Sequence, residues 1–197
     1  MTIVKKTGIV SVFAACTFLA IAGAEDGFEP IFNGEDFSGW KNTDGWAAED
    51  GMLKVVADGG DIWTEEEYES FELRFEFNVS EGGNSGVFFR RAGLEVQLLD
   101  DYADKYADLK DWQYCGSLYG LVAAGERASK CAGEWQAMWI GLDGQQLTVI
   151  LNGVRIVEAD LDELEGHAGL APGPGHIGFQ NYRGSEIKLR NIELHEL

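Results

Sequence analysis

Residues 71–79 have the sequence "FELRFEFNV", and the alternation in this stretch decides the fold class. Phe71, Phe75 and Phe77 fall on one face together with the other odd-numbered apolar residues, while charged and amide side chains fall on the opposite face. A period of two residues is typical of a strand that buries one face against a core and leaves the other polar. The stretch therefore predicts a strand of an antiparallel sheet with one buried face.

Tight turns connect further strands of the same kind. Asp143-Gly144 and Asn152-Gly153 each separate two stretches that are rich in β-branched and aromatic residues. These dipeptides tolerate the positive φ angles of two-residue hairpin turns, so they predict β-hairpins. Strands are expected over residues 94–100, 134–142, 146–151, 154–159, 176–182 and 187–197.

The last of these strands changes phase along its length. Ile187 and Leu189 have one parity, whereas Ile192 and Leu194 have the other. One extra residue in the strand would bring both pairs to the same face, so we expect a β-bulge near Asn191.

Helical patterns are scarce. Only residues 100–112, "DDYADKYADLKDW", have helical spacing, with aspartates four residues apart. Many short strands, 26 glycines and little helix predict an all-β protein, namely an antiparallel β-sandwich or jelly roll. No internal repeat or linker divides the chain, so residues 25–197 are expected to form a single domain.

The N-terminal residues 1–24 have the layout of a secretory signal peptide. Lys5 and Lys6 make a basic start, an apolar stretch follows, and the segment ends in the small residues Ala22-Gly23-Ala24. The apolar stretch is shorter than the ~20 residues of a membrane-spanning helix. We therefore expect a secreted or periplasmic protein with no membrane association after cleavage. A retained anchor is the alternative.

The net charge restricts the ligands that the protein can accept. The chain has a formal charge of −19, and removal of Lys5 and Lys6 makes it more negative still. Such a protein repels the phosphates of nucleic acids and anionic lipids. A small neutral, polar ligand such as a sugar is the expected partner.

Two cysteines, Cys115 and Cys131, remain after loss of the signal peptide. An even number of cysteines in an exported protein favours a disulfide. The bridge would close a loop of roughly 15 residues and contribute about 3 kcal/mol on the chain-entropy model. Two separate thiols are the alternative.

Short segments along the chain together form a recognisable series. They are "IFNGEDFSGW" (31–40), "AEDGMLKV" (48–55), "FELRFEFNVSEGGNSGVFFR" (71–90), "LEVQLLD" (94–100), "SLYG" (117–120), "SKCAGEWQ" (129–136), "LTVILNGVRI" (147–156), "HIGFQNY" (176–182) and "LRNIELHEL" (189–197).

In this order the segments resemble the 3-keto-disaccharide hydrolase domain family, over nearly all of residues 25–197. The resemblance implies a concanavalin A-like jelly roll and a protein that acts on, or binds, glycosides oxidised to a ketone at C3. Two features depart from the family pattern. Cys131 stands where the family usually has proline, and the acidic stretch 100–112 is particular to this chain.

Glu95 is the candidate catalytic residue. In a 3-keto-glycoside the proton on C2 is acidified by the adjacent carbonyl, so a single carboxylate can remove it and the resulting enolate can expel the C1 substituent. The alternation in "LEVQLLD" places Glu95 and Gln97 on one face, opposite to Leu94, Val96 and Leu98. The competing interpretation is a polar pair that faces solvent on an ordinary half-exposed strand.

Further residues are candidates for substrate binding. Gln97 is expected to bind hydroxyls, Asn84 offers hydrogen bonds, and Arg90 is expected to polarise a ketone or hold a hydroxyl unless it forms a structural ion pair. Aromatic rings in loops or at strand ends can stack on a sugar, although each can also serve packing. The remaining candidates are Trp63, Tyr119, Gln180 and Tyr182, with Trp112 as a further loop aromatic.

No cofactor is expected. The three histidines do not have the spacing of a zinc site. A calcium site among the aspartates of residues 100–112 is a weaker alternative to a solvated acidic helix face. The resulting hypothesis is an enzyme that cleaves 3-keto-glycosides. The alternatives are a non-catalytic, lectin-like carbohydrate-binding module of the cell envelope and an envelope protein with a structural or interaction role.

Overall fold

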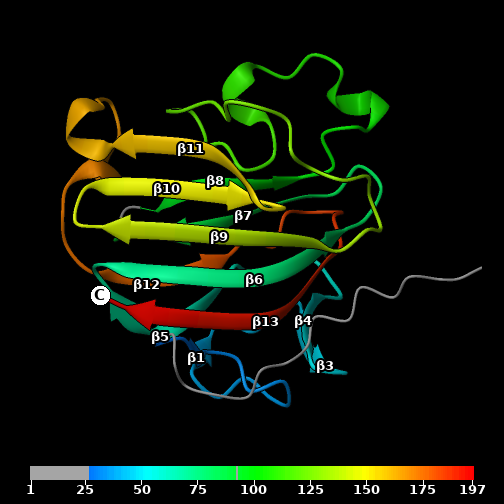
Figure 1. Ribbon diagram of the computed structural model, residues 1–197. Helices are drawn as coiled ribbons and strands as arrows, with labels where there is room; N and C mark the ends of the chain where they lie inside the picture. The colour runs from blue at the N-terminus through cyan, green and yellow to red at the C-terminus, as the bar shows by residue number, and fades with distance from the viewer. Residues whose placement is uncertain (1–26, 92) are drawn as a thin grey trace, which may run out of the picture.

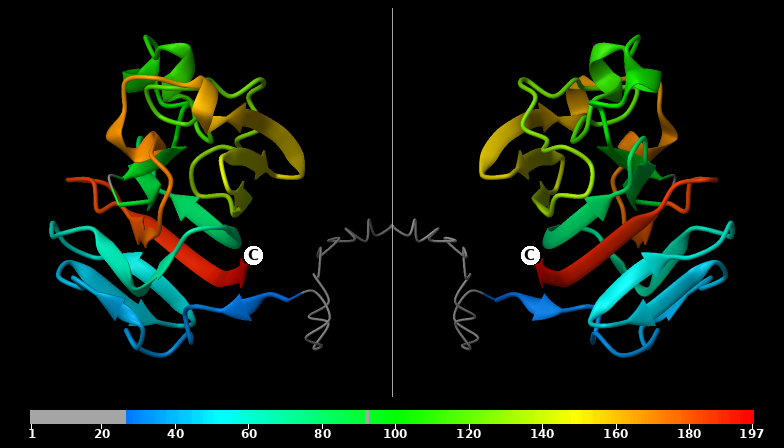
Figure 2. Two further views of the ribbon diagram at one scale, coloured as in Figure 1. Left: turned by 90° about the vertical axis from the view of Figure 1, so that its left-hand side faces the viewer. Right: turned by 90° about the vertical axis from the view of Figure 1, so that its right-hand side faces the viewer.

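The computed structural model describes residues 27–91 and 93–197, and the predicted signal peptide, residues 1–24, lies outside the described residues. Two antiparallel sheets pack face to face as a sandwich (Figure 1). Figure 2 shows the two layers from the sides, with the loops of residues 100–130 gathered at one end. The predicted all-β antiparallel sandwich is confirmed.

The larger sheet has eight strands in the order β11-β10-β9-β6-β13-β4-β3, with β1 beside β13. Its strands are β1 (Glu29–Pro30), β3 (Trp46–Glu49), β4 (Met52–Val55), β6 (Phe71–Val79), β9 (Gln136–Asp143), β10 (Gln146–Leu151), β11 (Val154–Asp160) and β13 (Ile187–Glu196). We call it the large sheet.

The second sheet, here the small sheet, has five strands in the order β2-β5-β12-β7-β8. They are β2 (Trp40–Lys41), β5 (Ile62–Tyr68), β7 (Asn84–Phe89), β8 (Leu94–Leu99) and β12 (Gly175–Phe179). Single 3₁₀ turns lie outside the sheets: η1 (Asp104–Tyr106), η2 (Asp111–Gln113), η3 (Leu161–Glu163) and η4 (Ala168–Leu170). In the described part of the chain no helix is long and apolar enough to cross a membrane.

The core lies between the two sheets. Every second residue of β6 is buried there, as the alternation predicts, and Phe71 and Phe77 are fully buried. Phe75 of the large sheet meets Phe179 of the small sheet edge to face, with ring centroids 5.3 Å apart. Such apolar contacts, at about 25 cal/mol per Å² of buried area, hold the small sheet in place.

The predicted Asn152-Gly153 turn and the bulge are present, whereas the hairpin between β9 and β10 turns at Gly144-Gln145, because Asp143 is still part of β9 and pairs with Gln146. Asn152 and Gly153 both have positive φ (52° and 84°), as a two-residue hairpin between β10 and β11 requires. In β13 the register to β6 shifts between Arg190 and Glu193, and Asn191 has φ 52°. The bulge therefore lies at Asn191 and returns Ile192 to the core.

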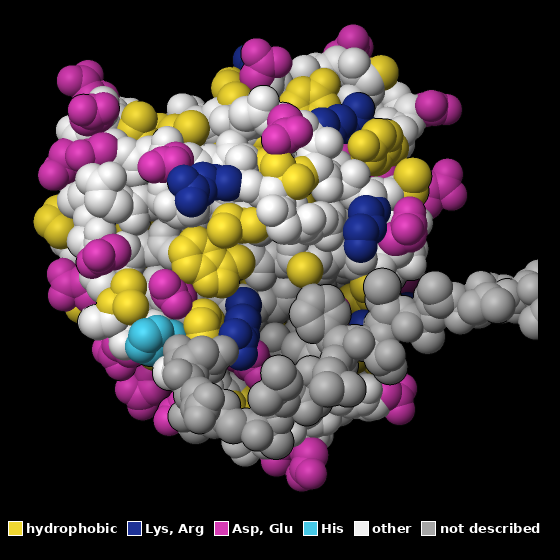
Figure 3. Space-filling model, in the orientation of Figure 1, with side chains coloured by type: hydrophobic (Ala, Val, Ile, Leu, Met, Phe, Trp, Pro, Cys, Tyr) yellow, Lys and Arg dark blue, Asp and Glu magenta, His cyan; other side chains and the backbone are white. Residues whose placement is uncertain are grey.

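The outer face of the large sheet is polar with isolated aromatic rings (Figure 3). Trp135 and Trp139 are partly exposed on this side of the sandwich, whereas Trp40 and Trp46 are buried in the core. The Arg190 guanidinium covers the Trp135 ring at 3.9 Å. Figure 3 shows acidic and basic side chains interspersed on this face.

The prediction of a helix over residues 100–112 is wrong, because the stretch contains only the turns η1 and η2. Asp100 and Asp101 are buried and do not form a solvated face. The Gly82 N–H donates to Asp100 Oδ2 at 2.7 Å, and the Cys115 N–H donates to Asp101 Oδ2 at 3.1 Å. Both carboxylates thus satisfy backbone donors of irregular loops, which competes with helix formation.

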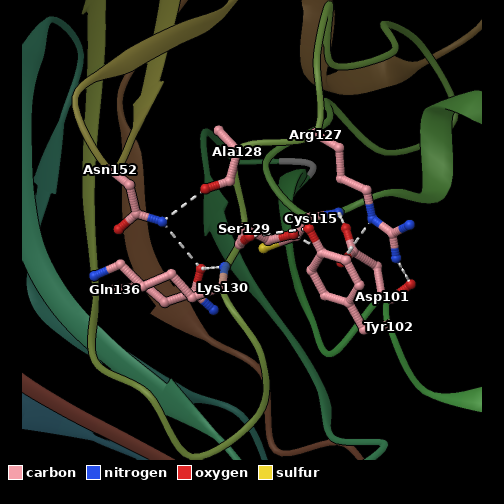
Figure 4. Close-up of polar contacts among 9 residues, drawn as sticks. All are labelled: Asp101, Tyr102, Cys115, Arg127, Ala128, Ser129, Lys130, Gln136 and Asn152. Carbon is pink, nitrogen blue, oxygen red and sulfur yellow. Dashed lines mark hydrogen bonds and ion pairs between the residues drawn. The ribbon is translucent and has the colours of Figure 1, made fainter.

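Asp101 is the centre of a polar network that fixes the loops (Figure 4). Ser129 Oγ donates to Asp101 Oδ1 at 2.7 Å, and Arg127 forms an ion pair with the same oxygen at 3.3 Å. Further along, Asn152 Nδ2 donates to the Ala128 carbonyl at 2.8 Å. The network therefore ties residues 127–129 to the end of β8 on one side and to the β10–β11 hairpin on the other.

The predicted disulfide is absent, since Cys115 and Cys131 are both free. Cys115 is buried, and burial raises the pKa of its thiol to about 12. Cys131 is exposed, in a turn closed by the hydrogen bond from the Glu134 N–H to its carbonyl. The disulfide was predicted from the even number of cysteines alone. In the structure, hydrogen bonds to Asp101 hold this loop instead.

Replacement of Asp101 tests this organisation. Asp101→Ala leaves the Cys115 N–H and the Ser129 hydroxyl without their acceptor, so we expect the free energy of unfolding to fall by about 2–4 kcal/mol. Asp104→Ala removes an exposed carboxylate from the same loop and should change it by less than about 0.5 kcal/mol. Equal stability of the two variants in urea titrations would contradict the assigned role.

Candidate functional site

The outer face of the small sheet carries a row of side chains that crosses all five strands. Lys41 lies opposite Trp63, Trp63 opposite Gly178, Gly178 opposite Phe88, and Phe88 opposite Glu95. Paired residues of neighbouring strands point to the same face of a sheet. The five positions therefore share the face that points away from the core, which we call the site face.

Two glycines make room for the functional side chains. A Cβ atom at Gly86 would lie 2.2 Å from Glu95 Oε1, so the Glu95 carboxylate extends across the bare backbone of Gly86. The Trp63 ring lies over Gly178 in the same way, since a Cβ there would be 2.5 Å from the ring. Trp63 stacks on Phe88 at 5.6 Å with an interplanar angle of 17°. Glu95 and the aromatic pair thus lie side by side.

The Glu95 carboxyl has an unusual electrostatic environment. Burial, and secondarily the negative charge of Asp61, raises its pKa to about 7. No residue in the described ranges 27–91 and 93–197 donates a hydrogen bond to this carboxylate. A half-buried carboxylate that is poised near neutrality and free of structural partners has the properties of a general base.

Amide side chains lie next to Glu95 on the site face. Gln97 is paired with Gly86 and is only 4% exposed, and its Oε1 has no hydrogen-bond partner. The Oδ1 atom of Asn84, two residues before Gly86 on β7, is also buried without a partner. Gln180 is half-buried, and its N–H donates to the Gly86 carbonyl at 2.9 Å. Unsatisfied amides beside a carboxylate can bind the hydroxyls of a polar ligand.

A loop segment extends the small sheet beyond β8. Leu118 forms a bridge to Val96, and the Tyr119 N–H donates to the Glu95 carbonyl at 2.8 Å. Leu118 is fully buried, so the alternation of side chains turns Tyr119 toward the site face. The Trp112 ring meets Tyr119 edge to face at 5.1 Å. A second aromatic pair therefore flanks Glu95.

Arg90 does not join the site, contrary to its predicted role in polarising a ketone or holding a hydroxyl. Its φ of 62° ends the alternation of β7 and turns the side chain away. The guanidinium is buried and donates to the carbonyls of Leu170 (3.0 Å), Ala171 (3.2 Å) and Gly144 (2.6 Å). Arg90 thus connects two loops, which is a structural role.

Two further residues near the site face were not predicted from the sequence, and one predicted residue lies at its margin. Asp61 precedes β5 and accepts from the Asn181 N–H at 2.9 Å, and its two-residue spacing from Trp63 was the available signal. Lys41 Nζ lies 2.8 Å from His176 Nε2, and no sequence pattern indicated this pair. Tyr182 is 48% exposed, beyond the end of β12.

No metal site is formed by three or more His, Cys, Asp or Glu side chains within residues 27–91 and 93–197. A cavity of about 650 Å³ lies elsewhere, between the end of β8 and the acidic loop. Its lining includes Glu81, Asp100, Asp104 and Cys131 but none of the predicted substrate-binding residues. The candidate site is therefore defined by the site face and not by this cavity.

The sequence matches the 3-keto-alpha-glucoside-1,2-lyase-like domain over residues 27–195. The chain belongs to this family. It is 30% identical to a 3-keto-disaccharide hydrolase of Bacteroides thetaiotaomicron, in a match that covers 56% of this chain and 50% of the relative. The chain thus spans about half the length of that curated relative. The family predicted from the ordered segments is confirmed.

Solved structures show the same architecture. A Parabacteroides distasonis protein assigned as a glycosyl hydrolase superposes with a TM-score of 0.79 at 31% identity, over 86% of this chain and 99% of its own. A second such protein from this organism has a TM-score of 0.75 at 25% identity, and the match covers 87% of this chain and 94% of that protein. The carbohydrate-binding module CBM66 of Bacillus subtilis gives 0.56 at 13% identity, over 82% and 98%, and shares the fold alone.

The raised pKa of Glu95 can be tested through stability. Between pH 4.5 and about 7 the folded protein retains a proton that the unfolded chain has released, so stability falls as the pH rises through this range. Glu95→Gln removes the buried charge and should raise the free energy of unfolding above pH 7 by about 1–3 kcal/mol. Below about pH 4.5 the gain should vanish.

The matched control for this test is Glu65→Gln, which neutralises an exposed carboxylate on β5. Unfolding in urea at several pH values should show no comparable gain for this variant. A Glu95→Gln effect that does not depend on pH would show that Glu95 does not titrate as the structure indicates.

Proposed function

We propose that this protein cleaves 3-keto-glycosides, with Glu95 as the base that removes the C2 proton. The observation that carries the proposal is the Glu95 carboxylate itself, which lies across Gly86 with a pKa of about 7 and no hydrogen bond from the described residues. Membership of the 3-keto-alpha-glucoside-1,2-lyase-like family and the similarity to a 3-keto-disaccharide hydrolase support the same chemistry.

The reaction begins with proton transfer from C2 of the sugar to Glu95. The electron pair of the C2–H bond forms an enolate with the C3 carbonyl. When the carbonyl reforms, a C1–C2 double bond forms, the C1–O bond breaks, and the leaving group takes up a proton. Addition of water to the enone then yields the free 3-keto-sugar. One base suffices for this route, so a pair of carboxylates at glycosidase spacing is not required.

The neighbours of Glu95 have complementary roles in this proposal. The stacked pair of Trp63 and Phe88 offers an apolar surface for the C–H face of the sugar ring. The unpartnered amide oxygens of Gln97 and Asn84 accept hydrogen bonds from hydroxyls of the sugar, and an amide N–H can stabilise the enolate oxygen. Gln180 completes the polar surface on β12. The substrate is accordingly a small, uncharged carbohydrate, and the protein is proposed to be secreted or periplasmic.

Glu95→Gln tests the base directly. The variant should fold and should lose about 10²–10⁴-fold in kcat/KM toward a 3-keto-disaccharide, measured by release of free sugar. In the wild type, kcat/KM should rise with pH and reach half its maximum near pH 7, because Glu95 must be deprotonated to accept a proton.

An unmodified disaccharide is the substrate control, because it lacks the ketone that acidifies C2. Release from the keto form alone supports the enzyme. Affinity without release would instead support a lectin-like module. If the protein neither binds nor cleaves the sugars, an envelope protein with a structural or interaction role remains.

Gly86→Ala tests the position of the carboxylate. The added methyl group would occupy the space of Glu95 Oε1 and would also crowd Cδ and Cγ of this side chain, but no backbone atom is among these neighbours, so the fold should persist while the base is displaced. We expect about 10–100-fold lower kcat/KM, since small misplacements of reacting groups have effects of this size. Gly60→Ala is the matched control, because a Cβ at Gly60 meets no atom within 4 Å. Full activity of Gly86→Ala would contradict the proposed geometry.

A further inference from the structure

Glu95 lies between two aromatic pairs. On the β7 side, Phe88 is its cross-strand partner and stacks on Trp63 at 5.6 Å. On the other side, the Tyr119 N–H donates to the Glu95 carbonyl, and Tyr119 meets Trp112 at 5.1 Å. Adjacent strands are ~4.8 Å apart, so each pair begins about one strand spacing from the base.

The two sides differ in their polar groups. The Glu95 carboxylate extends over Gly86, on the β7 side. The amides with unpartnered oxygens, Gln97 and Asn84, flank this position on the site face, and Asp61 is near enough to raise the pKa of Glu95. The carbon that loses its proton must therefore lie over β7, where hydroxyls and a ketone also find partners. This assigns the keto-sugar ring to the side of Trp63 and Phe88.

The other aromatic pair, Trp112 and Tyr119, is held by contacts from its own loop. The Tyr119 hydroxyl accepts from Gln113 Nε2 at 3.2 Å, and Lys110 Nζ lies 5.4 Å from the centroid of the Trp112 ring. Gln113 Oε1 in turn accepts from the Lys110 N–H at 3.0 Å. These contacts hold both rings in position before a ligand binds, which lowers the entropic cost of binding.

We propose that the Trp112–Tyr119 pair is the leaving-group subsite, which selects glycosides whose C1 substituent is itself a ring, such as a second sugar or an aromatic aglycone. The inference rests on the proposed function, because C1 is bonded to the carbon that Glu95 deprotonates. With the keto-sugar over β7 and its C2 at Glu95, a C1 substituent directed away from Gly86 crosses β8 and meets Tyr119. Trp112 lies in η2, at the end of the acidic stretch 100–112, and so the loop beyond β8 supplies this ring.

Two substrates that share the keto-sugar but differ at C1 test the proposal. Tyr119→Ala and Trp112→Ala should each lower kcat/KM toward a 3-keto-disaccharide by about three- to tenfold, as expected for loss of one aromatic contact. Toward the corresponding methyl 3-keto-glycoside, which has no leaving ring, both variants should match the wild type within about twofold. Tyr119→Phe keeps the ring and should retain most of the discrimination.

Trp135→Ala is the control, because it removes a partly exposed aromatic ring that directly precedes β9 of the large sheet and lies under Arg190. This variant should leave kcat/KM unchanged toward both substrates. Equal losses of kcat/KM toward both substrates would overturn the assignment and indicate that the pair merely supports Glu95. An unchanged kcat/KM toward both substrates would also overturn it. Thermal unfolding of each variant verifies that it is folded.

Failure of the proposed function is separable from failure of the subsite. If the wild type cleaves neither substrate, the catalytic proposal fails, and calorimetric titration of the Glu95→Gln protein with the same two compounds then decides the subsite. The subsite is supported if Glu95→Gln binds the disaccharide more strongly than the methyl glycoside. This difference should be lost when Glu95→Gln is combined with Tyr119→Ala or with Trp112→Ala. Equal binding of the two compounds excludes the subsite.

Discussion

The candidate site depends on the antiparallel register of the small sheet. Each of its five strands contributes one position to the row that crosses the site face, and the register brings Gly178 and Gly86 beside the two side chains that need space. Trp63 and Glu95 can lie flat across the sheet only because these neighbours lack a Cβ. A slip of one residue in β8 would turn Glu95 into the core, so the apolar residues on the buried face maintain the chemistry on the other.

The charged groups that are withdrawn from water have two kinds of environment. Arg90 and Asp101 are buried with several hydrogen-bond partners each, and both connect loops that are distant in sequence. Glu95 is also withdrawn from water, yet it has no such donor in the described residues, and its proton is therefore held more tightly. The difference is physically meaningful, because the hydrogen-bonding capacity of the structural groups is used within the protein, whereas a base must be ready to exchange its proton.

The loops between β8 and β9 add a feature that the sheets alone do not supply. Asp101 anchors them to the end of β8, and the segment around Leu118 pairs with the free edge of the small sheet. This pairing places Tyr119, and through it Trp112, directly beyond the base. The acidic stretch thus shapes one side of the site face, although its aspartates have mainly structural or solvent-exposed positions.

The sequence by itself determined the elements with local causes. Alternation identified β6 and β8 and assigned Glu95 and Gln97 to one face, and the paired positive-φ residues and the phase change at Asn191 located a hairpin and the bulge. Only the tertiary structure decided which residues meet. Arg90 left the site through one left-handed residue, Asp61 and Tyr119 joined it from distant segments, and the cysteines stayed apart. Local patterns follow from the geometry of the strand, whereas these outcomes depend on long-range pairing and burial, which no short stretch of sequence contains.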